Sequence, residues 1–355
     1  MNLTVLSVAY PFAPVGPDSV GGAEQVLTQL DAALVAAGHR SIVVASAGSR
    51  TQGELLATPA VEGAITPQQR VRTWAAQRRT IERALAQQHV DVVHLHGIDF
   101  PAYLPPEGQV PLLATLHLPP SWYPPEVFAG VRQDLWLHCV SRSQQQACPA
   151  GTPQLPVIEN GVPVQALQAR CRRRRFALAL GRICPEKNVH VALDAGRLAG
   201  IPVLLGGQVF PYEAHERYFH EQVVPRLDGQ RRFLGPLNFQ RKRRLLSAAH
   251  CLLLPTLAAE TSSLVAMEAL ACGTPVVAFA SGALPEIVEH GVTGFLVRGT
   301  AEMADAIAAC DSIDRERCRA TARERFSLQR SIARYFDVYQ HLACGERTAT
   351  RCAYA

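Results

Sequence analysis

Two glutamates bracket the start of an apolar segment in the second half of the chain. Glu260 precedes Ser262 and Ser263, and Glu268 lies within the apolar run that ends at Gly273. The apolar residues before Glu260 predict a strand, and the glycine predicts the end of a helix that begins near the two serines. Glu260 is therefore expected in the loop before the helix, and Glu268 on its second turn.

The start of this helix has the chemistry of an anion site. Backbone N–H groups around Ser262, Ser263, Leu264 and Val265, together with the positive end of the helix dipole, favour a phosphate or diphosphate. Carboxylates beside such a site are better suited to accept hydrogen bonds from hydroxyl groups than to bind the phosphate. Hydroxyl groups on both sides of a diphosphate describe a nucleotide sugar.

A simpler alternative assigns Ser262 to helix capping and Glu268 to a solvated helix face. The neighbours of Glu268 are apolar around the whole helix, which favours a buried helix. A buried carboxylate needs a partner, so the sequence predicts one for Glu268.

Two cations follow an earlier predicted strand at residues 176–180. Arg182 and Lys187 come directly after it, and a helix is expected from about Val189. Cations at the end of a strand can neutralise a diphosphate leaving group. A solvated surface pair is the alternative for these two residues.

Residues 260–279, ETSSLVAMEALACGTPVVAF, resemble the E-x7-E donor-site signature of family-4 glycosyltransferases. Those are retaining enzymes of the two-Rossmann-domain (GT-B) fold. The segment from Arg182 to Asn188 also resembles the G-R-x-x-x-E-K-N element of that family. Many members have Pro-Phe-Gly or Gly-Phe-Gly after the first glutamate, where this chain has Thr-Ser-Ser, so the departure concerns which sugar fits. The resemblance is strong from about 176 to 297 and looser before.

This resemblance implies transfer of a sugar from a nucleotide-diphosphate donor, such as a UDP-sugar, to an acceptor hydroxyl with retention of configuration. Arg182 and Lys187 would stabilise the diphosphate, Glu260 would hold hydroxyls of the sugar, and Glu268 would hold those of the ribose. His117 would contact the transferred sugar. No metal and no further cofactor are expected.

The first half contributes a strand, a loop rich in proline and glycine, and a helix opened by Gly21, Gly22 and Glu24. Because G-x-G-x-x-G is absent, a dinucleotide cofactor is not expected. In the resembled family the Gly-Gly pair lets the backbone approach the donor phosphate and the acceptor, and Glu24 is assigned to the acceptor side. Leu234, after a strand of the second half, is placed beside the base.

Histidines end two strands of the first half. His94 and His96 share one strand face by the period of two, and His117 ends the next apolar run. A His-x-His pair can bind metal, but no third ligand at a telling spacing accompanies it. His96 is therefore assigned to the acceptor side, and a satisfied core histidine is the alternative for His117.

Composition restricts the class of protein. The chain has 355 residues, 48% hydrophobic and 18% charged, which fits two globular domains. Ten cysteines without a C-x-x-C pair argue against a zinc site and a disulfide framework. No apolar run is long enough to span a membrane and no secretory leader is recognised, so a cytoplasmic protein is expected.

The charge is uneven, with a slightly acidic first half and a basic second half that includes Arg172–Arg175. Without a recognisable reading element or interleaved aromatic residues, nucleic acid is not an expected partner. A helix predicted over 66–88 carries several arginines. It is interpreted as a surface helix, with an anionic acceptor or a peripheral membrane contact as the alternative.

Alternating strands and helices predict an α/β protein with two Rossmann-like, doubly wound parallel sheets facing an interdomain cleft. The expected domains are 1–162 on the acceptor side and 163–325 on the nucleotide-sugar donor side. Residues 326–355 form a C-terminal helix that crosses back to the first domain, followed by a tail.

Two other functions stay open at this stage. A non-hydrolysing nucleotide-sugar 2-epimerase shares the two-domain fold, and a non-catalytic nucleotide-sugar-binding subunit would keep the same polar residues. For the transferase, the acceptor is expected to be a sugar, a lipid-linked compound or a small molecule, in the synthesis of cell-surface polysaccharide, glycolipid or glycoconjugate.

Overall fold

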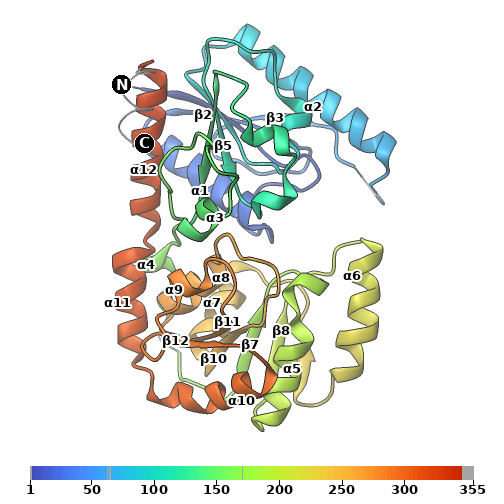
Figure 1. Cartoon of the computed structure of the whole chain (residues 1–355), viewed down its shortest axis with the longest axis vertical. Helices are drawn as coiled ribbons and strands as arrows, with labels where there is room; N and C mark the ends of the chain where they lie inside the picture. Colours follow the sequence, from blue (N-terminus) through green and yellow to red (C-terminus); the bar gives the residue numbers. More distant parts are fainter. Residues whose placement is uncertain (1, 62, 64, 170, 346–355) are drawn as a thin grey trace. The chain divides into compact units, whose positions relative to one another are not determined.

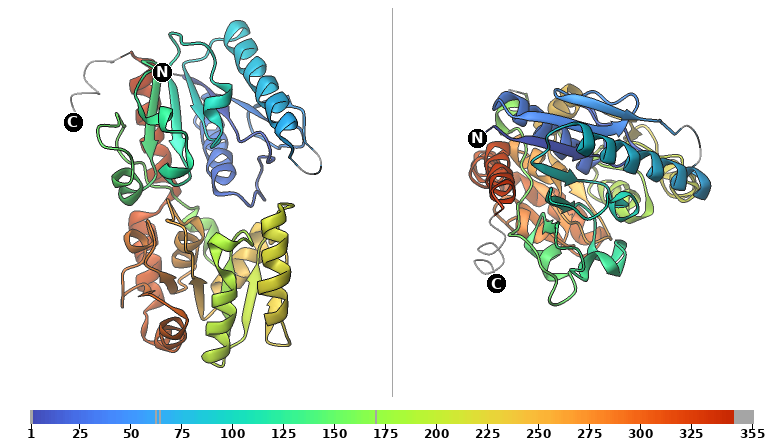
Figure 2. Two further views of the ribbon diagram at one scale, coloured as in Figure 1. Left: turned by 45° about the vertical axis from the view of Figure 1, so that its right-hand side comes forward. Right: turned by 90° about the horizontal axis from the view of Figure 1, so that it is seen from above.

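The computed structural model describes residues 2–61, 63, 65–169 and 171–345, so most of the predicted C-terminal tail lies outside the described residues (Figure 1). The chain forms two compact units. Unit 1 contains the residues up to Glu159 together with those from Ser331 onward, and unit 2 contains Asn160–Arg330. Each unit is an α/β structure built on one parallel sheet (Figure 2).

The sheet of unit 1 has the strand order β3-β2-β1-β4-β5-β6, and all of its pairs are parallel. The strands are β1 (Thr4–Val8), β2 (Arg40–Ser46), β3 (Glu54–Thr58), β4 (Val92–Leu95), β5 (Leu112–Leu116) and β6 (Leu135–Cys139). The main helices are α1 (Gly22–Ala36), α2 (Pro67–Gln87) and α3 (Arg142–Gln146). The order reverses between β1 and β4, which marks the point where open α/β sheets bind ligands.

Both faces of this sheet are covered. On β2, Val43 packs in the cluster that contains Leu27 of α1, whereas Ile42 and Val44 pack in the cluster that contains Ile81 of α2. Neighbouring residues of a strand point to opposite faces, so α1 and α2 cover opposite sides. This double burial explains why the strands read as continuous apolar runs.

The sheet of unit 2 has the equivalent order, β12-β11-β10-β7-β8-β9, again with parallel pairs. Its strands are β7 (Ala177–Leu180), β8 (Val203–Gly206), β9 (Arg231–Phe233), β10 (Cys251–Leu254), β11 (Val276–Phe279) and β12 (Gly294–Val297). Its helices include α4 (Val164–Leu167), α5 (Val189–Leu198), α6 (Glu213–Tyr218), α7 (Phe239–Ala248), α8 (Leu264–Ala271), α9 (Leu284–Ile287), α10 (Thr300–Ala309) and α11 (Arg315–Arg325). The order reverses between β7 and β10.

The last helix, α12 (Leu328–Ala343), starts in unit 2, and from Ser331 its residues belong to unit 1. Its buried residues Ser331, Tyr335, Tyr339 and Leu342 recur at helical spacing and form one face. The predicted return of the final helix to the first domain is thus seen in the contacts of Tyr335 and Tyr339 with His94.

Two segments of unit 1 depart from what the apolar pattern of the sequence indicates. The apolar segment 156–158 does not extend the sheet, and β6 is its edge strand. Backbone N–H groups of Leu155 and Ile158 do bond to β6, but Pro156 has no N–H group and the ladder does not develop. Strand β3 was missed, because its residues are mostly half-buried or exposed and lack a clear apolar pattern.

Within the residues that the structure describes, no helix has both the length and the apolar character required to cross a membrane.

Candidate functional site

In unit 2, the predicted donor-site residues gather at the carboxyl ends of β7 and β10, where the strand order reverses. Arg182 lies just after β7, and Glu260 lies in the loop after β10. Gly207, after β8, packs so closely that a Cβ atom there would lie 1.8 Å from the carbonyl oxygen of Gly181. Only glycine permits this approach, which fixes the backbone next to Arg182.

Lys187 and Glu260 form a side-chain ion pair. The pair joins the loop after β7 to the loop after β10, and its two side chains are 25% and 12% exposed. The next residue, Asn188, adopts a left-handed backbone with φ of 53° and precedes α5. Asparagine tolerates this conformation better than most residues, so it can end the turn that carries Lys187.

Helix α8 begins just after the loop that carries Glu260, and it has no side-chain cap among the described residues. Ser263 is its N-cap residue, and the buried hydroxyl oxygen of Ser262 has no hydrogen-bond partner in the described part of the chain. The N–H groups of Leu264 and Val265 belong to the first turn, where no intrahelical carbonyl is available to them. An anionic ligand would satisfy these donors.

Glu268 is buried on the second turn of α8, as the sequence predicts. Its partner is Lys242 of α7, with 2.5 Å between Lys242 Nζ and Glu268 Oε1. The side chains are only 5% and 18% exposed for Glu268 and Lys242. Sequence reasoning missed Lys242, because it lies within the basic run Arg241–Arg244, which resembles a solvated helix face.

The amino-acid composition of the chain singles out the two lysines that pair with Glu260 and Glu268. Lys187 and Lys242 are the only lysines in the sequence, and every other basic side chain apart from histidine is an arginine. One lysine pairs with Glu260 and the other with Glu268. This signal was available from the sequence alone.

Leu234 follows β9, which is the edge strand of the sheet of unit 2. Its N–H group donates to the carbonyl of Leu205 at 2.8 Å, and its side chain is half-buried. It therefore lies at the same carboxyl edge of the sheet as Arg182.

In unit 1, the predicted residues also collect where the strand order reverses. Gly21 is the N-cap residue of α1, Gly22 is its first residue, and Glu24 is buried in its first turn. A Cβ atom on Gly21 would lie 1.8 Å from Oε2 of Glu24, so the glycine leaves room for this carboxylate. His96, directly after β4, approaches the same end of the sheet.

His96 and His117 form a stacked pair at this edge. Nδ1 of His96 lies 3.1 Å from Nε2 of His117, and the rings are inclined by 19°. The main-chain N–H of His117 donates to the hydroxyl of Tyr123 at 3.0 Å. Nε2 of His96 is buried without a hydrogen-bond partner among the described residues.

His94 has a different role from His96. The main-chain carbonyl of Cys139 can only accept, so Nδ1 of His138 carries the ring proton and donates to it. Nε2 of the neutral ring then accepts a hydrogen bond from the hydroxyl of Thr115. That hydroxyl in turn accepts from Nε2 of His94, and Nδ1 of His94 accepts from the hydroxyl of Tyr339. Both nitrogens of His94 are occupied, so the predicted alternative of a His94–His96 metal pair is not supported.

Burial keeps these histidines neutral. It lowers the pKa of His117 to about 3 and that of His138 to about 4. Burial also lowers the pKa of His94 and of His96, and the neighbouring histidines lower both further. These histidines therefore offer uncharged donors and acceptors near neutral pH.

One group of side chains in unit 2 has the composition of a metal site. Cys184, Glu186 and His215 place their ligand atoms within 4.8 Å of one another. The sequence predicted no metal site. His215 lies far along the chain from Cys184 and Glu186, so no short spacing in the sequence indicates this group.

Comparison with known proteins assigns both halves of the chain to the same kind of enzyme. A family model described as Glycosyltransferase Family 4 matches residues 20–166, and one described as Glycosyl transferases group 1 matches residues 174–310. A phosphatidyl-myo-inositol mannosyltransferase of Mycolicibacterium smegmatis is 28% identical over 331 residues, which cover 83% of this chain and 81% of that protein. A D-inositol 3-phosphate glycosyltransferase of Mycobacterium bovis is 33% identical over 174 residues, covering 44% of this chain and 36% of that protein.

Among solved structures, Anabaena Alr3699/HepE in complex with UDP-glucose superposes with a TM-score of 0.73 at 20% identity. The superposition covers 96% of this chain and 100% of HepE. At this identity the likeness concerns the fold. The two parallel sheets, the paired family models and the mannosyltransferase match agree with one another, and the chain is a glycosyltransferase of the two-domain GT-B fold.

Proposed function

We propose that this glycosyltransferase moves a sugar from a nucleotide-diphosphate donor to an acceptor hydroxyl with retention of the anomeric configuration. One observation carries the proposal. The ion pair of Lys187 and Glu260 joins the loops after β7 and β10 at the carboxyl edge of the sheet of unit 2, the edge at which Arg182 also lies. The start of α8, which has no side-chain cap among the described residues, follows Glu260 directly. Cationic side chains and free N–H groups suit a diphosphate, and a neighbouring carboxylate suits the hydroxyls of a sugar.

In the proposed reaction, the bond between the anomeric carbon and the diphosphate oxygen breaks as the acceptor oxygen bonds to the same face of that carbon. The acceptor proton passes to the departing phosphate oxygen. Arg182, Lys187 and the N–H groups near Ser263 and Leu264 stabilise the charge that develops on the diphosphate. This step requires no metal, no nucleophilic side chain and no further cofactor.

The remaining residues of unit 2 are proposed to bind and orient the nucleotide sugar. Glu260 accepts hydrogen bonds from the sugar and Glu268 from the ribose, and each carboxylate is held by its lysine. Ser262 and Val265 contact the diphosphate, and Leu234 contacts the base. For Ser262, a buried hydroxyl oxygen without a hydrogen-bond partner in the described residues supports this role.

On unit 1, His117 is proposed to contact the transferred sugar. Gly21 and Gly22 allow close approach of the backbone, and Glu24 and His96 serve the acceptor. The lowered pKa of His117, caused by burial, supports hydrogen bonding by a neutral ring rather than by a cation.

UDP is the proposed carrier nucleotide, because HepE is described in complex with UDP-glucose. A cyclic polyol or its lipid-linked form is the proposed acceptor, because the two relatives are named for phosphatidyl-myo-inositol and D-inositol 3-phosphate. Such chemistry fits glycolipid or glycoconjugate synthesis at the cytoplasmic side of a membrane. None of the similar proteins named above supports a 2-epimerase or a non-catalytic subunit.

The test combines donor binding and product analysis. The purified chain is heated with UDP-, GDP-, ADP- and dTDP-sugars, and a ligand at about 100 times its Kd stabilises the native state by about 2.7 kcal/mol. We expect one nucleotide series to raise the Tm, with a smaller rise in Lys187→Ala and Glu268→Ala. Arg232→Ala, at an exposed position of β9, is the matched control.

Product analysis then tests retention. With the stabilising donor and a panel of sugar, polyol and lipid-linked acceptors, NMR of the glycoside should show the anomeric configuration of the donor. An inverted product would contradict the mechanism while leaving the transferase assignment intact. A folded protein that no diphosphate sugar stabilises would contradict the donor site itself.

A further inference from the structure

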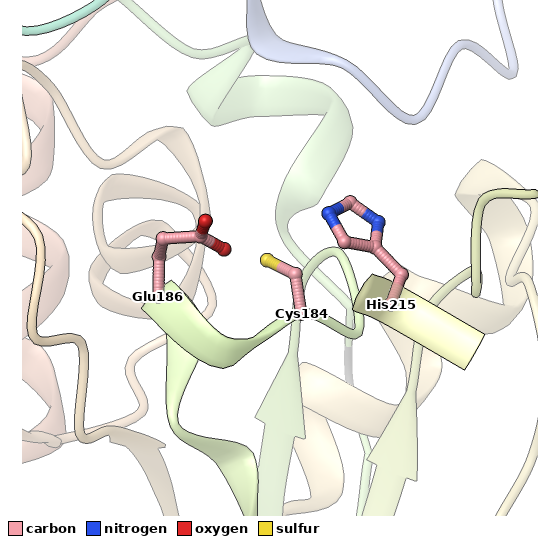
Figure 3. Close-up of side chains that lie close together, drawn as sticks. All are labelled: Cys184, Glu186 and His215. Atoms are coloured by element: carbon pink, nitrogen blue, oxygen red, sulfur yellow. The ribbon is translucent and has the colours of Figure 1, made fainter. Parts of the chain in front are cut away.

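Three side chains with different ligand chemistry converge in unit 2, apart from the residues assigned to the transfer reaction. Cys184 precedes the short 3-10 helix Pro185–Lys187, Glu186 lies within that helix, and His215 lies in α6. Figure 3 shows the thiol of Cys184 between the carboxylate of Glu186 and the ring of His215. Their ligand atoms all lie within 4.8 Å of one another.

The donor set selects among metals. A thiolate, an imidazole and a carboxylate are the ligands of zinc sites, whereas magnesium and calcium prefer oxygen ligands alone. Zinc lies about 2.0–2.3 Å from such ligands, so neighbouring ligand atoms of a tetrahedral site are about 3.5 Å apart. Only a small closure of the three side chains is needed to reach that geometry from the observed limit of 4.8 Å.

The three side chains are partly or fully shielded from solvent. Cys184 is fully buried and His215 is 9% exposed, while Glu186 is half-buried. Nδ1 of His215 is buried without a hydrogen-bond partner among the described residues. Figure 3 shows the other ring nitrogen, Nε2, on the side of the ring that faces the thiol of Cys184, so Nε2 is the atom that would bind a metal. Nδ1 would then carry the ring proton and could donate it to an ordered water.

Charge around the cluster can be balanced. Burial raises the pKa of the Cys184 thiol to about 11, and the thiol donates to the carbonyl oxygen of Arg182, with 3.9 Å between Sγ and that oxygen. Coordination would displace that proton to the solvent, because the thiolate is the form that binds metal. A thiolate and a carboxylate then neutralise the two charges of the cation, which offsets repulsion from Arg182 nearby.

We propose that Cys184, Glu186 and His215 form a zinc site with a fourth position open to water, and that this site fastens α6 to the turn that carries Lys187. The main chain of the turn is already tied to the loop after β10, since Leu257 donates to the carbonyl of Glu186 at 2.9 Å. The metal acts by holding this turn and takes no part in the transfer step. The proposal does not rest on the transferase activity, because all three ligands lie within unit 2.

The test uses the full chain freed of metal by a chelator and then titrated with Co²⁺ alone. We expect saturation near one equivalent, an absorption band from charge transfer between thiolate and Co²⁺, and strong visible bands typical of tetrahedral coordination. Binding of Co²⁺ to the metal-free chain should release about one proton per site. Zinc should then displace the cobalt without further proton release, and the zinc-bound chain should have a higher Tm than the metal-free chain.

The variants Cys184→Ser, Glu186→Gln and His215→Ala should each weaken Co²⁺ binding by at least tenfold, and Cys184→Ser should also abolish the charge-transfer band. Cys344→Ser and His220→Ala are matched controls, since both residues are exposed and His220 is near His215 in the chain. These controls should bind as the wild type does.

A charge-transfer band that survives in Cys184→Ser, equal binding by all variants, or no binding by the wild type would each overturn the proposal. If Cys184→Ser does not fold, Co²⁺ binding by His215→Ala and Glu186→Gln decides the question, because these side chains lie nearer the surface.

Discussion

The two units have equivalent strand orders, yet the candidate residues at their switch points differ in charge. In unit 2, Glu260 and Glu268 each pair with a lysine, and Arg182 lies nearby. In unit 1, the equivalent edge carries histidines that burial keeps neutral. The same scaffold thus offers carboxylate–lysine pairs and an arginine, suited to a diphosphate, in one unit, and a group of neutral histidines in the other.

The largest effect should come from breaking the buried pair of unit 2. Glu268→Gln leaves the mostly buried ammonium of Lys242 without its carboxylate, and breaking a buried ion pair costs about 3–5 kcal/mol. Urea unfolding followed by circular dichroism should show this loss for the transition of unit 2. The double variant Glu268→Gln/Lys242→Met should recover a large part of it, and equal losses in single and double variants would contradict the pairing.

The next effect concerns catalysis. Lys187→Ala removes a proposed cation from the diphosphate, and loss of one such stabilising group lowers the rate by about 10²–10³-fold. Steady-state kinetics should show a fall mainly in kcat, because the developing charge is largest in the transition state. Lys187→Arg keeps the charge and should retain part of the activity. A wild-type kcat in Lys187→Ala would show that Lys187 does not stabilise the transition state.

The neutral histidines of unit 1 predict an acid sensitivity. Their folded pKa values lie below the unfolded value of about 6.5, so the unfolded state binds more protons as the pH falls. Their stabilisation is fully present above the unfolded pKa and is lost progressively as the pH falls toward about 4, the pKa of His138 in the folded protein. For His138, with a folded pKa of about 4, this linkage should remove roughly 1.5 kcal/mol of stability between pH 6.5 and pH 5.

Urea unfolding at several pH values measures this slope. His138→Asn should reduce the slope by the share of one histidine, whereas His220→Ala, at an exposed position, should leave it unchanged. A stability that is flat from pH 6.5 to pH 5 would contradict the neutral network.

A smaller effect should follow when α12 loses its polar contact with the sheet. Tyr339→Phe removes the hydroxyl that donates to Nδ1 of His94 at 2.7 Å and leaves that buried nitrogen unpaired. An unsatisfied buried acceptor costs about 1–3 kcal/mol. Hydrogen exchange should rise in the part of α12 that belongs to unit 1, and an unchanged exchange rate there would show that the hydroxyl is not needed.

The sequence predicted what local patterns determine. The apolar runs specified most strands, and Gly273 together with the serines located α8 to within one or two residues. Burial of Glu268 followed from the apolar neighbours of this helix. These features depend on periodicity and capping, which a sequence displays directly.

The parts that were missed depend on tertiary contacts. Lys242 and Glu268 are on different helices, and His215 is far in sequence from Cys184 and Glu186. No fixed spacing predicts such pairs, because the fold sets their distance. The hydrogen-bonded series from Tyr339 to His138 is a second example, since it joins α12 to strands near the start of the chain.

The central claim is that unit 2 binds the diphosphate of the donor through Arg182, Lys187 and the start of α8. Calorimetric titration of the chain with UDP and with uridine tests this directly, because the two ligands differ only in the diphosphate. We predict that UDP binds at least about 100-fold more tightly, a difference of about 2.7 kcal/mol, and that Lys187→Ala removes most of this difference. Equal affinities for UDP and uridine, or a difference that Lys187→Ala and Arg182→Ala both leave unchanged, would contradict the account.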